Sequence, residues 1–318
     1  MEAIGGFIEW EGWSEGKGTL FQAQEAASGR SAFTLILEEL KPDLVFVPYY
    51  CCDSLLEPLR NLNIEYSFYE LNEDWMPIVL PSYGENDYFL YIDYFGLCKN
   101  QCEELFDHFG DQMILDLTMA FFHKPDHGLY GFNSCRKFFG VQDGAYAFNL
   151  KRTLDLPPNE SNSDRHLQLR SQGDLANAYP EFLKNEESIP WTSKGMSLQT
   201  QEVMSAIDYD QVSERRRENF LYLHQELGRH NQLSWNELED QVPLYYPFKP
   251  AKHFDRKELI PEKIFLATIW PDVIQRGDSD YKYSIELSAE ILPLPIDQRY
   301  EPKDLERMVK LIQEKLNV

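Results

Sequence analysis

Two charged residues in the first half of the chain have types and positions that suit covalent and acid–base chemistry. Asp116 stands near the end of the apolar run QMILDL, and Lys137 follows in YGFNSCRKFFGVQDGAY, on a loop between two expected strands. A carboxylate at the carboxyl end of a buried strand either caps the next segment or belongs to a functional site. Lys137 also has two interpretations: a solvated lysine at a loop tip, or an amine that bonds covalently to a carbonyl group.

A serine-rich turn earlier in the chain could supply an anion site. Ser28, Gly29, Arg30 and Ser31 precede a helix expected over residues 32–40. A helix that opens on Gly-x-Ser presents free backbone N–H groups and a hydroxyl, which together suit a phosphate. The alternative is that the serine only caps the helix.

A lysine, a carboxylate and a phosphate-ready helix N-terminus are the three parts that pyridoxal 5′-phosphate (PLP) requires. Lys137 would form a Schiff base with its aldehyde carbon, and Asp116 would pair with the protonated ring nitrogen, which keeps the ring an electron sink. Ser31, the adjacent amides of Gly29 and Arg30, and Ser134 would hold the phosphate. The sequence therefore predicts a PLP site.

The elements that must position these residues follow a regular order. Short apolar runs rich in β-formers lie at 43–48, 64–71, 87–95 and 112–117, and SLLEPLRNL and CKNQCEELFDHFG between them have helical patterning. Strands that alternate with helices predict βαβ units and a mainly parallel sheet. Such sheets bind ligands beyond the carboxyl ends of their strands, which directs attention to VPYYCCD, DYFG and DLTMAFF.

The second half of the chain lacks this regular order. A polar stretch from about 152 to 195 ends in a helical segment, and 197–228 predicts one long helix or a broken helix pair. Strands and helices follow in VPLYYPF, KIFLATIW and YSIELS, and EPKDLERMVKLIQEKL is the terminal helix. We therefore expect an α/β fold with two domains: a large PLP-binding domain over 1–195, then a connector helix and a small α+β domain over 196–318.

The charge of the chain restricts its partners. The 318 residues carry a formal net charge of −23, which argues against non-specific nucleic-acid binding because phosphate backbones attract concentrated lysine and arginine. A small anionic ligand would need a local cationic site, and Arg30, the pair Arg136–Lys137 and the run Arg215–Arg217 are the candidates. The run lies in ERRRENFLYLHQEL, whose helical period favours a solvated helix face.

The cysteines and the N-terminus bear on the compartment. The chain has five cysteines, of which Cys51 and Cys52 are adjacent, and this favours reduced thiols over a disulfide framework. Cys98 and Cys102 lack a second pair that would complete a zinc site. No apolar run reaches the ~18 to 20 residues of a membrane span, and MEAIGGFIEWEGW lacks the pattern of a secretory signal. We expect a cytoplasmic protein without a membrane segment.

Several of these segments, taken in order, resemble the fold-type I, aspartate-aminotransferase-like superfamily, and in particular the DegT/StrS-type sugar aminotransferases. ASGRSAF resembles the phosphate turn, MILDLTMA the strand whose Asp meets the pyridine nitrogen, and SCRKFFGVQDGAY the segment of the cofactor lysine. ERRRENFLYLHQEL resembles the connector helix, VPLYYPF the first small-domain strand, and ILPLPIDQRY the segment before the last helix.

The resemblance implies a PLP-dependent aminotransferase that moves an amino group from an amino acid, glutamate above all, to a keto-sugar. The sugar would be nucleotide-linked, the pathway amino-sugar or surface-polysaccharide biosynthesis, and the protein a homodimer. The residue against the cofactor ring would be Tyr50, with Cys52 as the other candidate. The chain departs from the pattern at Met119, where the family commonly has Gln, and no cross-dimer segment is evident around GMSLQTQE.

Alternatives remain open at this point. One is a PLP-dependent lyase or dehydratase, although the similar sugar dehydratases have histidine in place of the lysine, and Lys137 argues against that version. Another is a degenerate member of the family that binds a ligand without turnover. His123 and His127 could line the site but are more simply loop residues, and Arg299 could meet an anionic substrate group.

Overall fold

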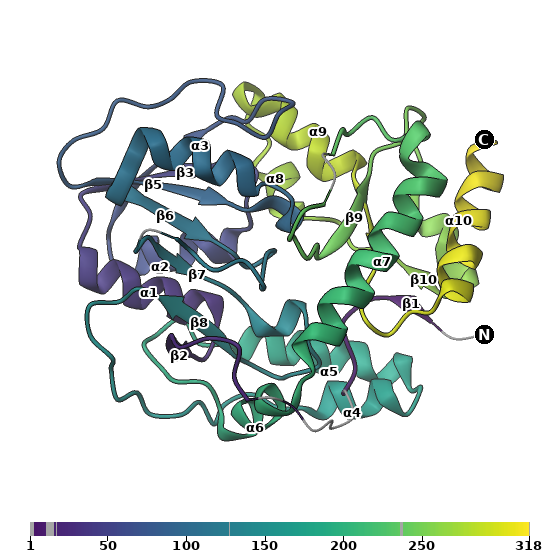
Figure 1. Cartoon of the computed structure of the whole chain (residues 1–318), viewed down its shortest axis with the longest axis horizontal. Coiled ribbons are helices and arrows are strands. Elements are labelled where there is room, and N and C mark those ends of the chain that lie inside the picture. Colours follow the sequence, from purple (N-terminus) through teal and green to yellow (C-terminus); the bar gives the residue numbers. More distant parts are fainter. Residues whose placement is uncertain (1–2, 11–15, 17, 127, 236–237, 318) are drawn as a thin grey trace.

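The largest sheet has seven strands and occupies the left half of the molecule in Figure 1. The computed structural model describes residues 3–10, 16, 18–126, 128–235 and 238–317. His127 and parts of MEAIGGFIEWEGW (1–2 and 11–13) lie outside the described residues. In spatial order the strands are β2 (Gln24–Ala26), β8 (Ala145–Phe148), β7 (Tyr130–Phe132), β6 (Met113–Asp116), β5 (Asp87–Ile92), β3 (Leu44–Pro48) and β4 (Glu65–Tyr69).

The pairing confirms the predicted mainly parallel sheet. Strands β7, β6, β5, β3 and β4 pair in parallel, and only β8 runs antiparallel to its neighbours β7 and β2. All four residues of β6 are buried, as expected for a central strand covered on both faces. The carboxyl ends of β6 and β7 therefore lie side by side at one edge of the sheet.

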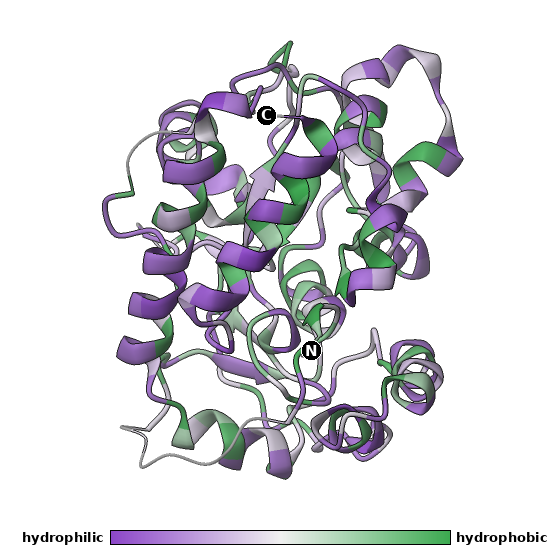
Figure 2. Cartoon of the chain, turned by 90° about the vertical axis from the view of Figure 1, so that its right-hand side faces the viewer, coloured by the Kyte–Doolittle hydropathy of each residue, from purple (hydrophilic) through white to green (hydrophobic). Residues whose placement is uncertain are grey.

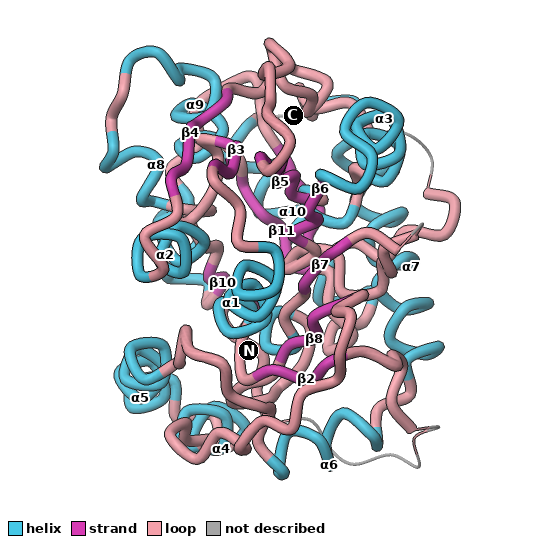
Figure 3. Tube along the Cα trace, turned by 90° about the vertical axis from the view of Figure 1, so that its left-hand side faces the viewer, coloured by secondary structure: helices cyan, strands magenta, loops and turns pink. Residues whose placement is uncertain are grey.

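Helices cover both faces of this sheet, as Figure 3 shows edge-on. Helix α1 (Gly29–Leu40) packs on β7 and β8, α2 (Asp53–Asn61) packs beside α1, and α3 (Lys99–Phe109) covers the other face at β6. Helix α1 begins at Gly29, earlier than predicted, because the Ser28 side chain accepts a hydrogen bond from the Ser31 N–H and caps the helix.

The helical segments predicted between residues 152 and 228 form four α-helices. They are α4 (Arg165–Ser171), α5 (Leu175–Ser188), α6 (Leu198–Ala206) and α7 (Tyr209–Leu227). Residues 197–228 form a broken helix pair and not one long helix, because α6 ends at Ala206 and the Asp208 side chain caps the start of α7.

The C-terminal part has its own hydrophobic cluster. Strands β9 (Tyr245–Phe248) and β11 (Leu292–Pro295) pair antiparallel and pack with α7 and α10 (Pro302–Leu316). The remaining elements are β1 (Ile4–Gly5), which pairs with β10 (Ile264–Phe265), and helices α8 (Pro271–Arg276) and α9 (Lys282–Glu290).

The helices of this part alternate hydrophilic and hydrophobic residues, as Figure 2 shows by colour. Helix α10, for example, buries Leu305, Met308, Val309, Ile312 and Leu316 at helical spacing. Among the described residues, no helix has both the length and the apolar character that crossing a membrane requires.

Candidate functional site

Lys137 lies where the chain leaves β7. It ends a short 3-10 helix, Cys135–Lys137, that follows Ser134. The Cys135 N–H donates to the Gly144 carbonyl, which ties the turn to the residue before β8. The half-buried Lys137 side chain points to the end of β6, where its Nζ donates to Thr118 Oγ1 at 3.0 Å.

Asp116 ends β6 and is 4% exposed. Its Oδ1 accepts a hydrogen bond from the Thr118 N–H at 2.8 Å. Burial raises the pKa of the Asp116 carboxyl, while the positive charge of Lys137 and the bonds from Thr118 act in the opposite direction. Thr118 therefore joins Asp116 and Lys137 through hydrogen bonds to both side chains.

The start of α1 approaches the same place. A Cβ atom added to Gly29 would lie 3.2 Å from Thr118 Cγ2 and 3.3 Å from the Asn133 carbonyl oxygen, so a larger residue would press on both strand ends. Asn133 precedes the buried Ser134. The first N–H groups of a helix have no partner within it, so those of Gly29 and Arg30 could bind an anion at this helix start, which lies against Thr118 and Asn133.

Other groups at this helix start contact the segment that follows α5. The hydroxyls of Ser28 and Ser31 donate to the Pro190 carbonyl at 2.7 and 3.0 Å. The Arg30 side chain pairs with Glu57 and donates to the Ile189 carbonyl. The side chains at the helix start therefore bind the 189–190 segment.

The two candidates for contact with a cofactor ring have different surroundings. Cys52 precedes α2 and is partly buried; burial raises the pKa of its thiol, and the positive charge of Lys137 acts in the opposite direction. Tyr50 is fully buried, with Tyr94 stacked on it at 5.6 Å and the Trp270 ring edge-on at 4.7 Å. Since protein rings enclose Tyr50, the geometry favours Cys52 for this contact.

Two residues that the sequence offered as anion contacts are engaged elsewhere. Arg136 forms an ion pair with Glu186 of α5, which fixes the loop of Lys137 to that helix. Arg299 is partly buried and pairs with Asp297 and Glu9. Met119 is buried as well.

The sequence analysis did not identify Thr118 as a site residue. The one feature that could have pointed to it is its position two residues after Asp116, which ends a strand.

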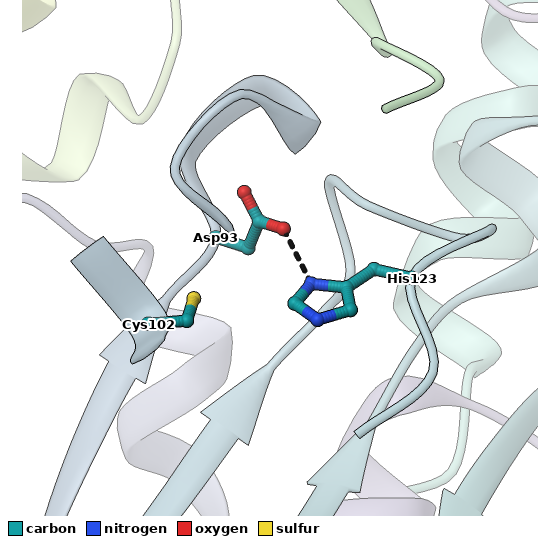
Figure 4. A group of neighbouring side chains, drawn as sticks. All are labelled: Asp93, Cys102 and His123. Carbon is teal, nitrogen blue, oxygen red and sulfur yellow. Dashed lines mark hydrogen bonds and ion pairs between the residues drawn. The ribbon is translucent and has the colours of Figure 1, made fainter. Parts of the chain in front are cut away.

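Asp93, Cys102 and His123 form a separate polar group beyond the end of β5 (Figure 4). Their ligand atoms lie within 4.8 Å of one another. Asp93 already uses both oxygens: Oδ1 accepts from the Cys98 N–H at 2.9 Å, and Oδ2 contacts His123 Nδ1 at 2.7 Å. His123 lines a cavity of about 250 Å³. We assign Asp93 a structural role, because it satisfies the helix start of α3 and orients His123.

Replacing Asp93 with alanine is expected to lower the free energy of unfolding by about 3 kcal/mol, because it leaves a buried N–H group and a histidine without their partner. Urea unfolding measures this change. Asp107→Ala, at an exposed position of α3, is the matched control and should change stability by less than about 0.5 kcal/mol. Equal stability of the two variants would contradict the structural role of Asp93.

Comparison with known proteins identifies the architecture. No protein-family model matches this chain, and no curated protein matches it in sequence. Among solved structures, it is similar to the sugar aminotransferase CalS13 from Micromonospora echinospora, with TM-score 0.62, 11% identity, and 92% of this chain and 87% of that chain covered. It is similar to Spr1654 from Streptococcus pneumoniae in its PLP form, with TM-score 0.62, 11% identity and coverages of 96% and 92%.

A third similar structure is that of DesI in the presence of its TDP-sugar product. It has a TM-score of 0.60 and 12% identity, and the match covers 92% of this chain and 79% of that one. Identities this low leave the sequence with little in common, whereas the course of the backbone is shared over nearly the whole chain. The protein therefore has the fold-type I architecture of these enzymes, with a mainly parallel sheet between layers of helices.

Proposed function

We propose that this protein is a PLP-dependent aminotransferase that transfers an amino group from an amino acid, with glutamate as the expected donor, to a nucleotide-linked keto-sugar. The observation that carries the proposal is the convergence of Lys137, Asp116 and the Gly29 turn on Thr118. The sugar is supported by the similarity to a sugar aminotransferase and to a structure with a TDP-sugar product. Amino-sugar or surface-polysaccharide biosynthesis would be the pathway.

The residues at this site carry the groups that PLP would require, namely an amine, a carboxyl group and a helix N-terminus, and these groups meet at Thr118. The N–H groups of Gly29 and Arg30, with the hydroxyls of Ser31 and Ser134, would hold the phosphate, provided that Ser31 turns from Pro190. Asp116 would pair with the ring nitrogen, and a positive partner offsets the cost of its buried charge. Cys52, or Tyr50 after a rearrangement of its neighbours, would contact the ring.

When bound, PLP supplies an electron sink for the carbanion formed at the substrate Cα. Lys137 would hold the cofactor in the resting enzyme and then carry the proton to and from the substrate. Thr118 Oγ1 accepts a hydrogen bond from Lys137 Nζ at 3.0 Å. This bond would hold the amine near Asp116 after it releases the cofactor and before it transfers the proton. Asp116 is 4% exposed, so little water would screen its interaction with the ring nitrogen.

The wider organisation is part of the proposal. We assign residues 1–195 to a large PLP-binding domain and 196–318 to the connector helix and small domain. A homodimer in the cytoplasm is the expected assembly and location. The net charge of −23 supports small-molecule substrates over nucleic acids.

The test is spectroscopic. Purified protein with PLP should show a visible absorbance band, and borohydride should remove the band and fix the cofactor on the peptide that contains Lys137. Adding glutamate should then yield pyridoxamine 5′-phosphate without release of ammonia. Lys124→Ala, an exposed loop lysine, is the control and should behave as the wild type. A colourless protein would refute both enzyme interpretations, and ammonia release would favour the lyase.

A further inference from the structure

The three consecutive arginines of α7 have three different environments. Arg215 is partly exposed and pairs with Glu218 at 3.5 Å. Arg217 donates from Nε to the Gln241 carbonyl at 3.0 Å and also contacts the Asp240 carbonyl. Arg216 is fully buried, so the expected solvated face is wrong for this residue.

The Arg216 side chain reaches the residue that follows Lys137. Its Nη2 donates to the Phe138 carbonyl at 3.2 Å, and its guanidinium lies over the Phe138 ring at 4.5 Å. Gln298 Nε2 donates to the same carbonyl at 2.9 Å. Arg216 Nε in turn donates to Gln298 Oε1 at 3.0 Å. The two side chains and the Phe138 carbonyl therefore close a ring of hydrogen bonds.

The other end of the guanidinium holds the chain that enters β9. Nη1 donates to the carbonyls of Leu244 at 3.2 Å and Pro243 at 3.4 Å. The Leu244 N–H donates to the Phe95 carbonyl beyond the end of β5. Arg216 thus joins the connector helix, the start of the C-terminal sheet and the loop of Lys137 at one buried point.

A buried guanidinium is costly unless its N–H groups are bonded, and here two bonds converge on a single peptide. That peptide directly follows the short 3-10 helix Cys135–Lys137. The position of the Lys137 backbone is consequently set from the C-terminal part of the chain as well as from β7. A displacement of about 1 Å at a reacting group can cost about 10²-fold in rate.

We infer that Arg216 and Gln298 are positioning residues that hold Lys137 in place through the Phe138 carbonyl. The inference rests on the proposed function for its kinetic consequence, but the geometry of Lys137 can be tested without that function. Because the pair acts on the loop of Lys137 through a backbone carbonyl, its loss should lower kcat and leave KM for glutamate nearly unchanged.

The experiment compares Arg216→Met and Gln298→Met with Arg217→Met, the matched control on the same helix that loses a guanidinium bonded to other carbonyls. In the holoenzyme, the first two variants should lower kcat by about 10²-fold and about 10-fold, with KM within about twofold. The pH midpoint of the visible band should move by at least about 0.5 unit, since the amine changes its surroundings. The control should match the wild type in all three measurements.

A second measurement uses the chain without PLP. The rate at which an amine-directed reagent labels Lys137, followed by peptide mass spectrometry, should change at least about threefold in Arg216→Met and Gln298→Met relative to Arg217→Met. Wild-type labelling in folded variants would overturn the inference. If Arg216→Met does not fold, Gln298→Met decides the question, because it keeps Arg216. If the wild type shows no visible band, the proposed function fails, and the labelling rates still decide the inference.

Discussion

Replacing Lys137 with alanine is expected to lower kcat for amino transfer by at least about 10⁴-fold, the upper range for a positioned acid–base group, because the same amine would also hold the cofactor. Its side-chain hydrogen bond joins Nζ to Thr118, and Lys137 is half-buried. The loss in unfolding free energy should therefore stay below about 3 kcal/mol, the upper range for one hydrogen bond from a charged group. Single-turnover kinetics and urea unfolding measure the two effects.

The variant Lys137→Arg distinguishes the reactivity of the Lys137 amine from its positive charge. Arginine keeps the positive charge near Asp116, but a guanidinium does not give up its proton near neutral pH, so the activity should be lost as in alanine. Recovery of activity in Lys137→Arg, or retention of more than about a tenth of kcat in Lys137→Ala, would exclude the role of Lys137 as cofactor lysine.

Replacing Asp116 with asparagine is expected to have the second-largest effect, a loss of about 10²- to 10³-fold in kcat, since a neutral amide cannot hold a proton on the ring nitrogen. The side-chain amide oxygen of Asp116→Asn can still accept from the Thr118 N–H, as the carboxylate does, so the local structure should persist. Steady-state kinetics with glutamate measure the loss. Retention of full activity would exclude Asp116 as the partner of the ring.

The same replacement should stabilise the protein without cofactor by about 1 kcal/mol near pH 8. Burial raises the pKa of Asp116 in the folded state above its unfolded value. At a pH between the unfolded-state and folded-state pKa of Asp116, the folded protein binds more protons than the unfolded chain. The contribution of Asp116 to the free energy of unfolding is therefore complete at acid pH and is lost as the pH rises through the folded-state pKa. Asparagine does not ionise, and its unfolding curve should lack this fall. A parallel pH dependence in both proteins would contradict the raised pKa.

The sequence by itself determined the order of strands and helices in the first half of the chain. Apolar β-forming runs such as DLVFVP and QMILDL specify buried strands locally, and alternation with helices leaves a parallel sheet as the arrangement that buries them. The position of Asp116 at a carboxyl strand end followed from the same pattern. The serine-rich turn before α1 was visible in the sequence too, although the helix begins at Gly29, three residues before the predicted start, because Ser28 caps it.

Tertiary packing decided which polar groups meet. Thr118 became the contact point of Lys137, Asp116 and Gly29, whereas neighbouring rings enclosed Tyr50. Arg216 lies four residues after the buried Val212 and four before the buried Phe220, so helical periodicity could have placed it on the buried face. Its partners Phe138 and Gln298 lie far away in the sequence. Periodicity encodes local conformation and the buried face, but long-range polar pairs arise only when the faces are packed together.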